Sequence, residues 1–154
     1  MDFELEVFLN GCDVFILVKP RSEGDELGKV MSSILRWSIT NADNVNMINA
    51  PLSVRLALGN ISEVYGGSLS LDNDEFNGLL LVGEEGNVVL SGRFKSCVRD
   101  TSPILAIELS NKLVNSLMSV YGNISSTVYV YRLVEKSTVE ASTIPEQMTS
   151  SPIP

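Results

Sequence analysis

The sequence predicts an α+β fold, with a largely antiparallel sheet of about six to eight strands and two helices packed on one face. Two observations lead to this prediction. Short runs of Val, Leu and Ile alternate with polar residues and are separated by turn residues, as in antiparallel strands. Other segments carry apolar residues at helical spacing and end at glycine. We expect one domain over residues 1–136 and a disordered tail, rich in Ser, Thr and Pro, over residues 137–154.

The first segment of the chain predicts a β-hairpin. Apolar residues alternate over residues 3–9, and Asn10-Gly11 supplies turn chemistry. The returning strand, residues 14–19, is nearly continuous in apolar residues, so we expect it to be buried on both faces. Residues 30–40 suit either a strand or a helix, and their β-branched residues favour the strand.

Residues 51–65 predict a central helix. Pro51 suits a first helical turn, and four apolar residues follow at helical spacing: Val54, Leu58, Ile61 and Tyr65. Apolar residues also alternate over residues 52–58, so a strand remains an alternative there.

The rest of the chain predicts mainly strands, over residues 68–71, 76–82, 88–95 and 104–109. Ser110 is then expected to cap a helix that has Leu113, Leu117 and Val120 on one side and ends at Gly122. A last strand over residues 127–134 is expected at a sheet edge, with exposed tyrosines.

The charge of the chain indicates which partners suit it. The 154 residues include 19 acidic and 11 basic residues, which gives a formal net charge of −8. Such a surface repels nucleic acid and anionic membranes and suits a basic protein partner, although solubility alone would also explain it. The sequence has no run apolar enough to span a membrane, and its first residues lack a signal-peptide pattern, so we expect a cytoplasmic protein that is either monomeric or a homodimer.

The residues needed for common catalytic and metal chemistry are missing. The chain contains no histidine, and Cys12 and Cys97 are expected to be free core thiols, with a disulfide as the alternative. The acidic run at residues 72–75 departs from the EF-hand pattern, because Asn77 and Gly83 occupy the sixth and twelfth positions. Glu108, in an otherwise apolar run, is the one acid suited to partial burial, but an exposed position on an edge strand is favoured. We therefore predict no catalytic residue, no cofactor and no metal site.

Surface acids and tyrosines are then the candidate partner-binding residues. Five acids are expected in turns: Asp72, Asp74, Glu75, Glu84 and Glu85. Glu4 and Glu6 add two acids on the first strand, and Tyr65, Tyr129 and Tyr131 are candidate aromatic anchors. The alternative is that each is simply a turn or edge residue.

A pattern over residues 67–121 consists of a short strand at residues 67–71, two strands joined by Glu84-Glu85-Gly86-Asn87, a further apolar run at residues 104–109, and a helix with Leu113, Leu117 and Val120. This pattern resembles the core of small bacterial immunity proteins of polymorphic and contact-dependent toxin systems, including the WapI-type group. The family pattern often has an acidic residue or glutamine at the start of the last helix, where this chain has Asn111-Lys112.

The resemblance implies a non-catalytic protein that binds and blocks a cognate toxin. Two alternatives remain open at this stage. A secretion chaperone or adaptor would be a homodimer with an apolar groove for an unfolded client. A structural component of a virus or phage particle would assemble with copies of itself. An enzyme with a site made only of carboxylates is a further alternative.

Overall fold

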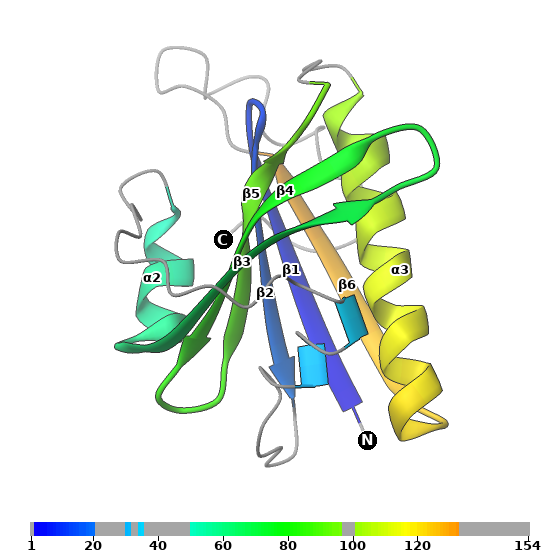
Figure 1. Ribbon diagram of the computed structural model, residues 1–154. Helices are drawn as coiled ribbons and strands as arrows, with labels where there is room; N and C mark the ends of the chain where they lie inside the picture. Colours follow the sequence, from blue (N-terminus) through cyan, green and yellow to red (C-terminus); the bar gives the residue numbers. More distant parts are fainter. Residues whose placement is uncertain (1, 21–29, 32–33, 36–49, 97–100, 133–154) are drawn as a thin grey trace.

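Within the described residues, six strands form one mixed sheet in the computed structural model, which covers residues 2–20, 30–31, 34–35, 50–96 and 101–132 (Figure 1). The strands are β1 (Asp2–Asn10), β2 (Asp13–Pro20), β3 (Ile61–Ser70), β4 (Glu75–Gly83), β5 (Val88–Phe94) and β6 (Ser125–Arg132), and the helices are α2 (Leu52–Leu58) and α3 (Ser102–Tyr121). The strand order is β3-β4-β5-β2-β1-β6. Only β1 and β6 pair in parallel, so the expected α+β fold with a largely antiparallel sheet is confirmed.

The β1–β2 hairpin lies inside the sheet, because β5 pairs with β2 and β6 pairs with β1. Its turn consists of Gly11 and Cys12, and Gly11 has a φ of +60°, which glycine adopts without steric cost. All five residues from Val14 to Val18 are buried. The expectation that β2 is buried on both faces is therefore confirmed.

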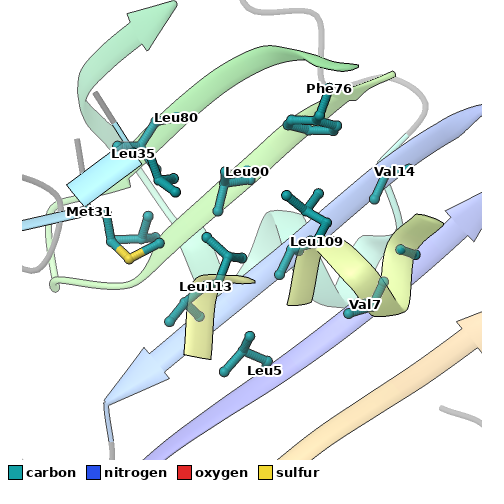
Figure 2. Close-up of a cluster of buried hydrophobic side chains, with 14 of the residues drawn as sticks. Leu5, Val7, Val14, Met31, Leu35, Phe76, Leu80, Leu90, Leu109 and Leu113 are labelled. Carbon is teal, nitrogen blue, oxygen red and sulfur yellow. The ribbon is translucent and has the colours of Figure 1, made fainter. Parts of the chain in front are cut away.

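The two sides of the sheet are covered by different helices, so the expectation that both helices pack on one face is wrong. On one side, which we call the α3 face, Leu109 and Leu113 lie over Leu5, Val14 and Leu90 (Figure 2). On the other side, the α2 face, Val54 and Leu58 pack with residues of the central strands, which are Phe8, Phe15, Leu17, Leu81 and Val89. Because β1 and β2 carry apolar residues on both faces, each face needs its own cover.

Residues 104–109, expected as a strand, belong instead to the 20-residue helix α3. Four fully buried residues, Ala106, Leu109, Leu113 and Leu117, follow helical spacing along one side. Pro103 occupies the first helical turn, where its missing N–H is not needed. Ser110 is not a cap: its hydroxyl donates a hydrogen bond to the carbonyl of Ala106, at 2.8 Å, inside the helix.

The helix expected over residues 51–65 ends at Leu58, and its second half belongs to strand β3. Gly59 stops the helix, with a φ of +63°, and the backbone then extends, so that Ile61 and Tyr65 lie in the sheet. Residues 30, 31, 34 and 35 are helical, which corrects the strand favoured there; residues 36–40 lie outside the described residues.

Cys12 is half-buried and disulfide-bonded, so the expectation of a free thiol at this position is wrong. Cys97, the second cysteine of the sequence, lies outside the described residues, as do the domain boundary at residue 136 and the tail over residues 137–154. Among the helices of the described part of the chain, none combines the length and apolar character needed to cross a membrane.

Helix α2 packs on the end of β4 through a close backbone contact at Gly83. A Cβ atom at this position would lie 2.2 Å from the carbonyl oxygen of Leu58, the last residue of α2. Because this carbonyl belongs to the helix backbone, rotating a side chain cannot relieve the clash. Glycine at position 83 therefore sets how closely α2 can approach the sheet.

We expect Gly83→Ala to lower the free energy of unfolding by about 1–3 kcal/mol, because α2 must move away from the sheet to admit the methyl group. Urea denaturation followed by circular dichroism measures this change. Ser68→Ala, at an exposed position of β3, is the control and should stay within about 0.5 kcal/mol of the unmodified protein. Equal stability of Gly83→Ala and the control would contradict the packing described here.

Candidate functional site

The two acidic turns expected to bind a partner lie at opposite ends of strand β4. Asp72, Asp74 and Glu75 lie at the β3–β4 turn, whereas Glu84 and Glu85 lie at the β4–β5 turn. Glu75 is the first of the nine residues of β4, and a strand of this length spans roughly 30 Å between the two turns. The structure therefore does not bring the five acids together into one contact surface.

The acids of the β3–β4 turn hold that turn in place. One carboxylate oxygen of Asp74 accepts hydrogen bonds from the backbone N–H groups of Glu75, at 2.7 Å, and Ser96, at 3.1 Å. The backbone N–H of Asp72 donates to the carboxylate of Glu108 at 2.8 Å. Glu108 is thus a half-buried residue of α3 that holds the turn, and the exposed strand position expected for it is wrong.

The β4–β5 turn is connected to the segment between α2 and β3. The backbone N–H of Glu84 donates to the carbonyl of Asn60 at 2.9 Å, and the Asn60 amide donates back to the Glu84 carboxylate at 3.4 Å. The side-chain amide of Asn87 donates to the carbonyl of Ala57 at 2.7 Å. These bonds give Glu84 a structural role, and Glu85 beside it is exposed.

A second group of acids does lie beside two tyrosines, on the α2 face of the sheet. The parallel register of β1 and β6 places Glu6 opposite Tyr129. Two residues before this pair, Glu4 lies opposite Thr127, and two residues after it, Phe8 lies opposite Tyr131. Because every second residue of a strand points to the same side, the side chains of all three pairs share one face of the sheet. We call Glu4, Glu6, Tyr129 and Tyr131 the Glu–Tyr surface.

The aromatic rings of this surface are stacked. The centroids of the Phe8 and Tyr131 rings are 5.1 Å apart with an interplanar angle of 23°, and those of Tyr129 and Tyr131 are 6.5 Å apart at 17°. Tyr131 is only 8% exposed and Tyr129 is half-buried, so the exposed tyrosines expected on this strand are not found. Because Phe8 is fully buried, the stack runs from the core at Phe8 outward to Tyr129.

Lys19 lies beside the acids of the Glu–Tyr surface. Lys19 forms an ion pair with Glu6, at 2.7 Å between the ammonium nitrogen and a carboxylate oxygen. Lys19 also lies opposite Glu4 in the β1–β2 register. Burial raises the pKa of Tyr131 above 10.0, and the charges of Glu6, Tyr129 and Glu4 raise it further.

Tyr65, the third tyrosine considered as an anchor, is not part of this surface. It lies on β3, at the opposite edge of the sheet, and its hydroxyl donates a hydrogen bond to the carboxylate of Glu63. This hydrogen bond, together with burial and the charge of Glu63, raises the pKa of Tyr65 above 10.0.

The chemistry available at the Glu–Tyr surface is that of recognition. Carboxylates accept hydrogen bonds from ammonium and guanidinium groups, and the faces of tyrosine rings attract cations. No group of three or more metal-ligating side chains comes together anywhere in the described ranges. Sequence reasoning named Glu4, Glu6, Tyr129 and Tyr131 separately. It missed Lys19 and the proximity of the four residues, because β1 and β6 are more than a hundred residues apart in the chain.

We expect Glu6→Gln to move the pKa of Tyr131 downward, towards 10.0, because it removes the charge that contributes most to raising this pKa. The pKa should remain above 10.0, since burial is the larger cause. The measurement is an alkaline titration of phenolate absorbance, with Tyr131→Phe identifying the signal of Tyr131. An unchanged pKa in Glu6→Gln would contradict the arrangement of this surface.

The same raised pKa has a consequence for stability at high pH. The folded protein holds the Tyr131 proton more tightly than the unfolded chain does, so this contribution is complete below pH 10 and is lost as pH rises through the folded-state pKa. Tyr131→Phe should therefore lose less stability than the unmodified protein between neutral pH and pH 11. Parallel urea titrations at several pH values measure this difference.

Comparisons of the chain with models of protein families, with curated proteins and with solved structures give no match.

Proposed function

We propose that this chain is a non-catalytic, acidic protein-binding module, and most concretely an immunity or inhibitor protein that blocks a cognate basic toxin. The observation that carries the proposal is the Glu–Tyr surface, where two carboxylates lie beside two stacked tyrosines on one sheet face. The formal charge of −8 supports a basic partner, and the absence of histidine from the sequence supports a role without acid–base catalysis.

The Glu–Tyr surface suits a partner that presents arginine or lysine. A guanidinium group can donate two parallel hydrogen bonds to one carboxylate and can also stack on an aromatic ring. Tyr129 is half-buried against Tyr131, so little side-chain freedom is left to lose when a partner packs on it. Inhibition would follow from steric occlusion of the partner's active site, with the negative potential of the protein increasing the rate of encounter.

The resemblance to small immunity proteins supports the proposal in part. The hairpin of β4 and β5 and the segment with Leu113, Leu117 and Val120 in α3 agree with the pattern. The apolar run at residues 104–109, however, is not separate from the last helix as in the pattern, because both belong to the single helix α3. The proposal therefore depends mainly on the charge and on the Glu–Tyr surface.

The cellular location belongs to the same proposal. A cytoplasmic location suits an inhibitor of an intracellular toxin, but the disulfide at Cys12 favours an oxidising compartment. Alkylation of intact cells, followed by mass spectrometry of the protein, decides between the two. An alkylated Cys12 supports the cytoplasm, whereas a Cys12 that reacts only after reduction contradicts it.

The test of the function is recovery of a partner on the tagged protein at low and at high salt. The double variant Glu4→Gln/Glu6→Gln should reduce recovery about tenfold or more, because it removes both carboxylates of the contact surface. The matched control is Glu84→Gln/Glu85→Gln, which removes the same charge at the β4–β5 turn and should have a much smaller effect. Circular dichroism checks that both variants are folded.

Three results decide the matter. A single basic protein that is released by salt, is lost with Glu4→Gln/Glu6→Gln and is inhibited by the unmodified protein supports the proposal. Equal weakening by both double variants would mean that net charge, and not the Glu–Tyr surface, governs binding. Failure to recover any basic protein from the host lysate would contradict the proposed function.

A further inference from the structure

The two outer strands of the sheet differ in how well they are protected against pairing with another strand. Strand β3 has a register irregularity between Ile61 and Glu63, a charged residue at Glu63, and the Gly66-Gly67 pair, all features that discourage edge pairing. The seven residues of β6 from Ser125 to Tyr131 contain no charge, no proline and no glycine, and their register with β1 is regular. Within the described residues, no strand pairs with the outer edge of β6.

Helix α3 has an exposed apolar flank that the sheet does not cover. Ile104 is 66% exposed, Ile107 38% and Met118 44%, and the three residues lie within about 60° of each other around the helix. The flank has Asn111 between its apolar residues and contains no charged residue. We call Ile104, Ile107 and Met118 the outer flank of α3.

The outer flank of α3 and the outer edge of β6 lie on the same side of the molecule. Glu108 and Lys112, on the other flank of α3, hydrogen-bond to the β3–β4 turn, at Asp72 and Ser70. Strands β3 and β6 are at opposite edges of the sheet, so the outer flank is turned towards β6. Tyr121, which lies around the helix on the same side as this flank, contacts Phe3 of β1, next to β6, with ring centroids 5.5 Å apart.

This combined surface fits a second copy of the same chain better than it fits a charged partner. The protein has a formal charge of −8, so two copies repel each other except where their surfaces are neutral. The β6 edge from Ser125 to Tyr131 and the outer flank of α3 form such a neutral surface. A two-fold axis that pairs β6 antiparallel with its copy also brings the apolar flank of α3 against the same flank of the second helix.

We propose that the protein forms a two-fold symmetric homodimer in which β6 pairs with β6 of a second copy, extending the sheet across the interface, and the outer flanks of the two α3 helices pack together. Main-chain hydrogen bonds along β6 provide the pairing, and burial of Ile104, Ile107 and Met118 stabilises it. The two Glu–Tyr surfaces then lie on one continuous sheet face. The dimer does not depend on the proposed inhibitor function.

Sedimentation equilibrium of the purified full chain, without any partner, tests the dimer. We expect a dimer in the micromolar range, weakened at least tenfold by Thr127→Lys, which places a like charge on both copies of the edge strand. Met118→Glu should weaken it to a similar degree by placing a charge in the apolar flank. Leu56→Glu is the matched control: Leu56 is an equally apolar residue, 72% exposed on α2, and its substitution should leave the dimer unchanged.

The proposal would be overturned by a protein that remains monomeric up to about 100 μM. It would also be overturned by a dimer that Leu56→Glu disrupts while Thr127→Lys and Met118→Glu leave it intact, because the interface would then lie on the α2 side. Circular dichroism of each variant separates loss of the dimer from loss of the fold. Met118 and Thr127 are both exposed or partly exposed, so neither change introduces a charge into the core.

Discussion

The β1–β2 hairpin is the part of the fold on which all the other elements depend. Its side chains contribute to both hydrophobic cores, with Val14, Ile16 and Val18 on the α3 face and Phe15 and Leu17 on the α2 face. Strand β5 pairs with one side of the hairpin and β6 with the other. Helices α3 and α2 cover the apolar side chains that the hairpin places on the two faces of the sheet. Burial of apolar surface on both sides of two central strands is therefore the main stabilising contribution in this architecture.

The same hairpin positions the candidate functional surface. On the α2 face of β1, the side chains change from apolar and buried at Phe8 to charged and half-buried at Glu6 and Glu4. Because β6 pairs with β1 in parallel, the tyrosines of β6 follow the same gradient, with Tyr131 beside the core and Tyr129 beside Glu6. The recognition surface is therefore an extension of the core towards solvent, which fixes its side chains more firmly than a loop would.

The sequence predicted the hairpins well and the helices less well. Alternation and turn residues located β1, β2, β4 and β5 to within one or two residues, because these signals are local. Residues 104–109 were mistaken for a strand because a short apolar run fits both structures, and only the sheet beneath α3 selects the helix. The Glu–Tyr surface depends on the pairing of β1 with β6, two strands that are far apart in the sequence. No local pattern indicates that β6 lies beside β1, so the acidic turns, which are conspicuous in the sequence, were given more weight than Glu4 and Glu6.

The parallel pairing of β1 with β6 has a consequence for biosynthesis. β1 is synthesised more than a hundred residues before its partner β6. Until then one backbone edge of β1, a strand whose residues Leu5, Val7 and Phe8 are apolar, has no neighbouring strand from the described part of the chain. The sheet of the nascent chain therefore stays incomplete until β6 has been synthesised. Chaperones that bind extended apolar segments would find their natural target in this strand during that interval.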